Sequence, residues 1–386
     1  MPGVRAEVLV VGGGPAGSTA ARLLAKDHDV IMAEEHPLPG EPMHCAGLVT
    51  QRGVPRFAEH SILKTVRGVK FHSSLGYVLT LEAKGSRACV IDRRQFDSIL
   101  FHRAVDAGAA PMVAAQVRSV HELRTEARAE MRFEGQLQQA MASVVIGADG
   151  HRSVCRRSAR LPAPKHMLLG IQVDMKDVDT DPDFVEVFFG RAVAPGFFAW
   201  AIPAGDATRV GLCTWDAQNT PAAYLKRFLS RKEFVRAKKV STASGRIPIG
   251  AGRSAVSGRI LLVGDAACHA KPLSGGGVYT AVKGGELCAR AVSDFFDGRG
   301  DLGAYDRLCR DEFGRELARA FRVRKVFLNL TDKKLDKALR IFGEPKVKGL
   351  LEEHGDIDYP ASLSSAVLKL APKLAQFSPQ IIESLL

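Results

Sequence analysis

The feature that most constrains the fold is a glycine-rich turn between a strand and a helix near the start of the chain. Residues 7–11 form an apolar run typical of a buried parallel strand, and Gly12-Gly-Gly-Pro-Ala-Gly17 follows at once. We expect a helix from about Ser18 to Lys26 and a second strand that ends at Glu34. In a dinucleotide fingerprint the glycines shape the turn, the pyrophosphate lies at the helix N-terminus, and an acid about 20 residues on binds the ribose hydroxyls. The pattern predicts a Rossmann-like site whose nucleotide contacts are Gly12, Gly14, Pro15, Ala16, Gly17 and Glu34.

A second glycine-rich turn follows an apolar strand much later in the chain. The run from Ile260 to Val263 predicts a short buried strand, and Asp265 follows it. Pro272 and the three glycines Gly275, Gly276 and Gly277 then precede a helix expected from about Val278 to Asp294. Backbone N–H groups at a helix start bind anionic or electron-rich groups. This stretch therefore predicts a cradle for a flat, polar ligand.

Two further segments are expected at the carboxyl ends of parallel strands, where sheets of this kind bind ligands. The proline-rich residues 36–50 predict a loop that presents Cys45, Ala46 and Gly47, although Cys45 could also be a small buried side chain. Ser143 to Gly150 repeats the order of an apolar strand followed by Asp-Gly. Asp149 is thus either a ligand-binding carboxylate like Asp265 or a simple turn residue.

From residue 168 to 245 the pattern changes to that of an antiparallel sheet. A period of two places Phe198, Trp200 and Ile202 on one face of their strand, while Gly211 and Cys213 share a face with Trp215 in the next. These side chains either leave an apolar slot between them or only pack against each other within the sheet. After about residue 278 the chain is predicted to be helical almost to its end.

The expected fold class is α/β: a Rossmann-like domain with a parallel sheet, an inserted antiparallel-sheet domain and a C-terminal helical region. We assign residues 1–66, 90–156 and 246–298 to the first domain, 67–89 and 157–245 to the second, and 299–386 to the third. Gly298-Arg-Gly-Asp-Leu-Gly303 also fits the fingerprint spacing. It follows a helix rather than a strand, so it predicts a helix-ending loop and no dedicated NAD(P) domain.

Composition limits the class of partner and the compartment. The net charge of +12 suits an anionic membrane surface or an acidic substrate, or is a solvated basic surface; no nucleic-acid-binding signature is present. Seven dispersed cysteines without a C-x-x-C pair indicate a reducing compartment and no metal site. We expect no signal peptide and no apolar run of the roughly 18 residues that span a bilayer. The expected location is cytoplasmic, with at most peripheral contact at the inner face of a membrane.

Taken together, the motifs resemble a flavoprotein group that includes aromatic hydroxylases and geranylgeranyl reductases. The motifs are GGGPAG, Glu34, HCAG at 44–47, Asp92-Arg93 with Phe96-Asp97, ADG at 148–150 and GDAACHAKPLSGGG at 264–277. The closer resemblance is to the geranylgeranyl reductase family, whose signature is aromatic-x-Trp-x-Phe-Pro and, seven residues later, Gly-x-Gly. Phe198-Ala-Trp-Ala-Ile-Pro203 and Gly211-Leu-Cys213 are similar to it, with Ile202 and Cys213 as departures. Residues 355–360 are also similar to archaeal members.

The resemblance implies noncovalently bound FAD and reduction of isolated C=C bonds in polyprenyl chains of lipids or their precursors. Asp265 would then hold the ribityl hydroxyls, and the turn at 275–277 would face the flavin pyrimidine edge. The implied FAD contacts beyond the fingerprint and Glu34 are Cys45, Ala46, Gly47, Arg93, Val117, Asp149, Asp265, Pro272, Gly275, Gly276, Gly277 and Val278. The implied substrate contacts are Phe198, Trp200, Ile202, Pro203, Gly211 and Cys213.

Several alternatives stay open at this point. The proton donor could be Cys45, His44, Tyr279 or an ordered water, and Cys45 could also be a spacer beside the flavin. The electron donor could be NAD(P)H or a protein such as ferredoxin. The second hypothesis is an FAD-dependent monooxygenase or halogenase with a compact, polar pocket for an aromatic or apolar small molecule. The third is a non-catalytic flavin- or lipid-binding protein.

Overall fold

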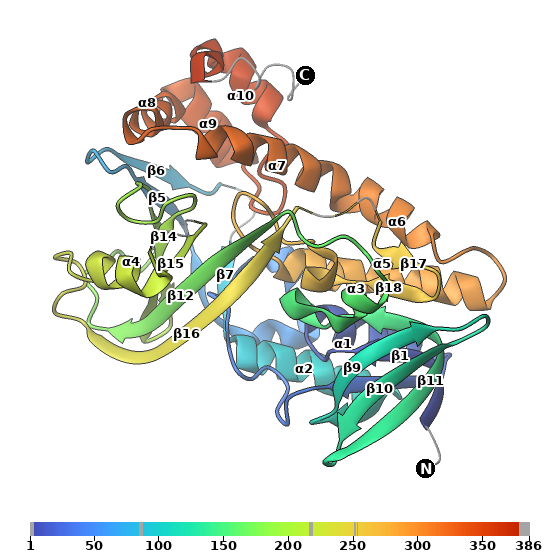
Figure 1. Cartoon of the computed structure of the whole chain (residues 1–386). Helices are drawn as coiled ribbons and strands as arrows, with labels where there is room; N and C mark the ends of the chain where they lie inside the picture. Colours follow the sequence, from blue (N-terminus) through green and yellow to red (C-terminus); the bar gives the residue numbers. More distant parts are fainter. Residues whose placement is uncertain (1–3, 85–87, 216–218, 251, 253, 378–386) are drawn as a thin grey trace.

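The computed structural model describes residues 4–84, 88–215, 219–250, 252 and 254–377. Figure 1 shows two large β-sheets and a group of C-terminal helices. The predicted α/β fold class is confirmed. The residue ranges of the three predicted domains stay a prediction, and their parts at 1–3, 85–87, 216–218, 251, 253 and 378–386 lie outside the described residues.

The first sheet contains the predicted parallel strands. Its order is β17-β18-β11-β1-β2-β8, in which β18, β11, β1, β2 and β8 run parallel, while β10 pairs with β11 and β9 with β10, both antiparallel. The strands are β1 (Val4–Val11), β2 (Val30–Glu34), β8 (Ala110–Val113), β9 (Gln116–Glu122), β10 (Ala127–Phe133), β11 (Gln136–Gly147), β17 (Val256–Ser257) and β18 (Ile260–Leu262).

The register of this sheet aligns the ends of three strands that are far apart in the sequence. Val11 pairs with Gly147, and Gly147 pairs with Leu262. The turns that begin at Gly12, Ala148 and Val263 therefore leave the same edge side by side. This edge is where doubly wound sheets bind ligands.

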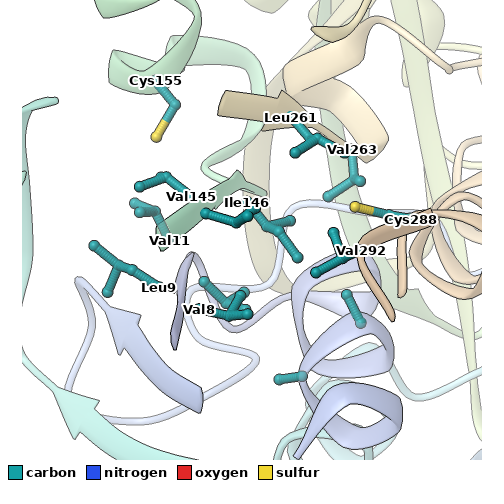
Figure 2. Close-up of a cluster of buried hydrophobic side chains, with 14 of the residues drawn as sticks. Val8, Leu9, Val11, Val145, Ile146, Cys155, Leu261, Val263, Cys288 and Val292 are labelled. Atoms are coloured by element: carbon teal, nitrogen blue, oxygen red, sulfur yellow. The ribbon is translucent and has the colours of Figure 1, made fainter. Parts of the chain in front are cut away.

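Three helices cover the parallel strands and complete the main core. They are α1 (Pro15–Leu24), α2 (Arg93–Asp106) and α5 (Val278–Phe296), and α1 packs between the other two. Figure 2 shows apolar side chains of β1, β11 and β18 meeting Val292 and Cys288 of α5 and Cys155 of α3 (Val154–Ser158). Asp92 caps α2 by accepting from the Arg94 and Gln95 N–H groups, which fixes where this helix begins.

The second sheet has the order β16-β12-β15-β14-β13-β5-β6 and is antiparallel except for the parallel pair β13–β5. Ala199 and Ala201 pack with α4 (Pro221–Phe228) on one face, while Trp200 and Ile202 lie on the other, as the period of two predicts. The strands are β5 (Gly68–His72), β6 (Val78–Glu82), β12 (His166–Lys176), β13 (Phe184–Phe188), β14 (Ala199–Ala204), β15 (Ala207–Thr214) and β16 (Lys238–Ile249).

A third, small sheet and the C-terminal helices complete the fold. The small antiparallel sheet holds β3 (Leu48–Thr50), β7 (Ala88–Ile91) and β4 (Ile62–Val66). The C-terminal helices are α6 (Ala304–Cys309), α7 (Arg315–Leu328), α8 (Asp332–Phe342), α9 (Pro345–His354) and α10 (Ser364–Leu370), with a π-helical turn at Arg310–Gly314 between α6 and α7. The 3₁₀ turns are Gln51–Gly53, Arg56–Ser61, Gly150–Arg152, Gly264–Ala267 and Pro372–Phe377.

Helix α9 covers the free edge of the second sheet. The Glu82 N–H donates to Glu352 Oε1 (3.1 Å), and the Lys84 N–H donates to the Glu352 carbonyl (3.0 Å). These bonds satisfy backbone groups that an edge strand leaves unpaired. They also tie the C-terminal helices to the sheet that carries Trp200.

Three local predictions differ from the structure. The sequence pattern from Met112 to Val117 predicts a single strand, but this prediction is wrong: β8 and β9 are separated at Ala114, whose φ is 56°. Helix α1 begins at Pro15 rather than Ser18, because proline is favoured at the first helical position. Strand β14 begins at Ala199, so Phe197 and Phe198 precede it. No helix in the described ranges is long and apolar enough to cross a bilayer.

A core truncation tests the packing in Figure 2. Leu261 of β18 is fully buried, so Leu261→Ala should lower the free energy of unfolding by about 2–5 kcal/mol through lost burial and the cavity left behind. Leu137→Ala is the matched control, because Leu137 is 65% exposed and should change stability by less than about 0.5 kcal/mol. Urea titration followed by circular dichroism measures both. Equal losses in the two variants would contradict the described packing.

Candidate active site

One cavity of about 1620 Å³ joins most of the predicted site residues. Its wall includes the turn after β1, the turn after β18, the loop at 40–48, the Trp200 face of the second sheet and parts of the C-terminal helices. The segments at Gly12 and Gly275 are more than 250 residues apart in the sequence, yet they line the same space. The sheet register described above brings them together.

The first end of the cavity has the geometry of a nucleotide site. Gly12, Gly14, Pro15 and Ala16 line it, and the N-cap of α1, Gly14, brings no side-chain cap to the helix start. Gly17 does not line the cavity. A Cβ there would clash with the Gly12 carbonyl, so Gly17 serves close packing of the turn.

Glu34 ties the end of β2 to this turn. The Gly13 N–H donates to Glu34 Oε2 (2.7 Å), and both the N–H and Nδ1 of His36 contact Oε1 (2.9 and 2.8 Å). Each carboxylate oxygen can accept two hydrogen bonds, so Oε2 keeps capacity for a ligand hydroxyl. Val117 also lies in the cavity wall, and its contact with FAD stays a prediction.

Asp149 has a structural contact as well as a place on the cavity wall. Its Oδ2 accepts from the N–H groups of Val154 (2.6 Å) and Cys155 (3.0 Å) at the start of α3. This contact shows why an Asp stands here independently of any ligand. Its predicted role in cofactor binding stays a prediction.

The second end of the cavity is formed by Asp265 and the glycine turn before α5. Gly275, Gly276, Gly277 and Val278 line it, and Gly277 is an N-cap that brings no side-chain cap. Pro272 does not line the cavity; its carbonyl faces Arg324 instead.

The Asp265 carboxylate faces the cavity, and no hydrogen-bond donor of the described residues reaches it. Burial raises the pKa of this carboxyl to about 6, against the attraction of Arg93 and Arg156. A buried carboxylate normally has a partner. The site therefore fits a ligand that brings hydroxyl donors.

The loop with Cys45 is fixed between the two ends. Gln172 donates to the Cys45 carbonyl (3.2 Å), and Arg209 donates to the carbonyls of Ala46 (2.8 Å) and Ile91 (3.0 Å). Gly47 has a φ of 74° and no room for a Cβ beside Arg209. Arg209 belongs to β15, so the second sheet positions this loop.

Cys45 itself lies half-buried beside a charged pair. It faces the Arg93 guanidinium, which also binds both carboxylate oxygens of Asp97 (2.9 and 2.7 Å). Of the other predicted proton donors, His44 lines the cavity. Tyr279 does not; its hydroxyl lies 3.0 Å from that of Tyr359.

The predicted substrate residues fall into two groups. Phe198, Trp200, Ile202 and Cys213 line the cavity, whereas Pro203 and Gly211 do not. Gly211 lies behind the wall. A Cβ at this position would come within 2.7 Å of Trp200 Cζ2, so the glycine leaves room for the Trp200 indole to lie against β15. Trp215 is also outside the wall, and its ring contacts that of His166 at a tilt of 36°.

The structure adds an apolar arm that the sequence reasoning missed. We give the name apolar arm to the part of the cavity wall formed by apolar side chains of β4, β5, β6, α7, α9 and the residue before α10. Its added lining residues include Val66, Val69, Phe71, Leu81, Phe327, Leu351 and Leu363. Helical and strand periodicity marks these positions as buried, but only the tertiary packing shows that they face a cavity: α8 and α9 contact β6, and Phe327 of α7 contacts Phe189.

Comparison with known proteins agrees with this geometry. The FAD binding domain family matches residues 5–310. Digeranylgeranylglycerophospholipid reductase 2 of Methanothermobacter thermautotrophicus is 31% identical over 358 residues, which cover 86% of this chain and 91% of that protein.

Two solved structures share the fold. One is a geranylgeranyl bacteriochlorophyll reductase-like protein of Thermoplasma acidophilum, with a TM-score of 0.81 and 23% identity over 96% of this chain and 99% of its own. The other is the flavin-dependent halogenase CmlS, with a TM-score of 0.72 and 18% identity over 97% of this chain and 78% of its own.

Fold and site together define a protein that binds FAD. Each end of the cofactor has a matching helix start and carboxylate. The N-terminus of α1, capped by Gly14, and Glu34 suit one end of FAD, and the N-terminus of α5, capped by Gly277, and Asp265 suit the other. Since the domain match spans most of the chain and a reductase is 31% identical, the chain belongs to the geranylgeranyl reductase family of FAD-binding proteins.

The ionisation of Asp265 should make FAD binding depend on pH. Ribityl hydroxyls favour the charged carboxylate, whereas protonation below its pKa of about 6 removes that acceptor. The Kd for FAD should therefore rise about tenfold as the pH falls from about 7 to about 5, and stay level above pH 7. Isothermal titration at several pH values measures it. Asp265→Asn should bind FAD more weakly and without this pH dependence; an unchanged Kd in the wild type would contradict the assignment.

Proposed function

We propose that this protein is an FAD-dependent oxidoreductase that saturates C=C bonds of geranylgeranyl or other polyprenyl chains in lipids or lipid precursors. The observation that carries the proposal is the apolar arm, whose residues line the same cavity as the glycine turn at 275–277. A long hydrocarbon chain suits such an arm, whereas an aromatic substrate that must be hydroxylated needs a compact pocket with polar groups. The reductase names of the relatives support the same reading.

The residues of the chain position the reactants and exclude water. When bound, reduced FAD supplies a hydride, and this chemistry belongs to the cofactor. Phe198, Trp200 and Ile202 form an apolar wall for the alkene, which receives the hydride at one carbon and a proton at the other. Cys45 and His44 line the cavity, so we propose that the proton comes from one of them or from a water that they hold.

We further propose peripheral contact with an anionic membrane, from which a lipid substrate would enter, and an external electron donor, either NAD(P)H or a protein. The net charge of +12 and the exposed Leu75 and Val78 at the β5–β6 hairpin support the membrane contact. Sedimentation with anionic lipid vesicles should carry down the wild type and less of a Leu75→Ser, Val78→Ser variant. Equal recovery in the supernatant with and without vesicles would contradict it.

Anaerobic turnover tests the main proposal. Protein loaded with FAD and reduced by dithionite is mixed without O₂ with a geranylgeranyl lipid, and the lipid is analysed by mass spectrometry. We expect its mass to rise in steps of two hydrogens, together with reoxidation of the flavin.

A matched pair of variants ties this activity to the apolar arm. Ile202→Trp should narrow the arm and slow reduction of the long chain without loss of FAD absorbance, whereas Val240→Trp, at an exposed position of β16, should not. A product heavier by one oxygen, formed only when O₂ is admitted, would contradict the proposal and indicate a monooxygenase. Flavin that stays reduced with every lipid would indicate a binding protein.

A further inference from the structure

Arg324 of α7 is a buried cation without a counter-ion in the cavity wall. Its side chain is only 2% exposed, although it contributes to the lining. The guanidinium donates to two carbonyls, that of Gly196 (2.8 Å) and that of Pro272 (3.4 Å), and its Nε has no partner. No carboxylate of the described residues forms an ion pair with it. A buried charge left unpaired in this way is costly.

Two aromatic rings enclose the guanidinium beside the flavin end of the cavity. Its carbon lies 5.1 Å from the centre of the Phe197 ring and 5.3 Å from that of Trp215. The Cζ atom of the same Phe197 ring lies within 3.3 Å of the Cβ position of Gly275. Phe197 therefore contacts both the guanidinium and the glycine turn, and the bond to the Pro272 carbonyl joins Arg324 to the segment that leads into this turn.

Arg324 keeps its charge at neutral pH. Burial lowers the pKa of its guanidinium to about 10, so it remains protonated. The nearby Cys213 thiol supplies no negative charge, because burial raises its pKa to about 12. The neighbouring wall is of low polarity, in which a charge is poorly screened. A positive field thus acts on whatever lies against the glycine turn.

We propose that Arg324 is an electrostatic positioning residue that stabilises the electron-rich, reduced form of FAD relative to the oxidised form. Reduction adds negative charge to the flavin pyrimidine ring, which the N–H groups of the turn at 275–277 would face, and the field of Arg324 adds to theirs. The inference rests on the proposed function for the place of FAD and deepens it by assigning a residue of the C-terminal helices to the cofactor.

A phosphate of a bound lipid is the other anion that Arg324 could serve. Direct binding of a phosphate needs an open face of the guanidinium, with several N–H groups free. Here Phe197 and Trp215 cover the group, and only 2% of the side chain is accessible. Because the two rings enclose the guanidinium, we expect Arg324 to stabilise the flavin by its electrostatic field rather than to bind a phosphate directly.

The test compares the affinity for oxidised and reduced FAD in the absence of lipid, so a negative result leaves the lipid reaction untouched. In Arg324→Gln, which can still donate to the carbonyls, we expect the preference for reduced FAD to fall at least tenfold. For a two-electron couple this equals a midpoint potential lower by about 30 mV. Arg324→Lys keeps the charge and should retain most of the preference. Arg322→Gln is the matched control, because it removes a charge from the exposed side of the same helix.

The outcomes separate an electrostatic role from a merely structural one. If Arg324→Gln does not bind FAD, Arg324→Met, which keeps the packing between the rings, takes its place. If the neutral variant keeps the wild-type ratio of affinities for reduced and oxidised FAD, the proposal is overturned. This holds also if the variant binds lipid more weakly, because the charge would then serve the lipid phosphate instead. Equal losses in the Gln and Lys variants would overturn it as well, because the preference for reduced FAD would then not depend on the charge at this position.

Discussion

The parallel pairing of β1, β11 and β18 builds the sheet edge at which the ligand site is assembled. Val11, Gly147 and Leu262 stand in register, so three turns from distant parts of the chain leave one sheet edge together. A slip of this register would reverse the side-chain faces of the strands and separate Gly12 from Asp265. The buried core of β1, β11, β18, α1 and α5 holds the pairing and thereby assembles a site for FAD from segments some 250 residues apart.

The cofactor end of the site could be predicted from the sequence because local chemistry determines it. Glycines at 12–17 and 275–277 are needed by turns of the backbone, and Glu34 and Asp265 follow directly on buried strands. Where the local pattern has two explanations, prediction was weaker. Asp149 both caps α3 and lines the cavity, and Tyr279 turns from the cavity toward Tyr359 although Gly277 and Val278 beside it line the wall.

The substrate end could be predicted only in part because tertiary packing determines it. The period of two placed Trp200 and Ile202 correctly on one face, but Pro203 and Gly211 lie behind that wall. Arg209 reaches from β15 to the loop with Cys45, and Arg324 reaches from α7 to Pro272; neither contact has a signal in sequence spacing. The halogenase shares the fold at 18% identity, so the fold alone does not choose between chemistries. The apolar arm is the feature on which we base the proposed reductase chemistry.

We infer that one cavity holds FAD and a prenyl chain end to end. A crystal structure of the protein, grown without O₂ with FAD and a geranylgeranyl lipid, can test this arrangement. We expect the flavin ring against Gly275 to Val278, an alkene in van der Waals contact with it, and the rest of the chain between Ile202 and Leu351. A lipid bound outside this arm, with FAD in place, would show that the proposed arrangement is wrong.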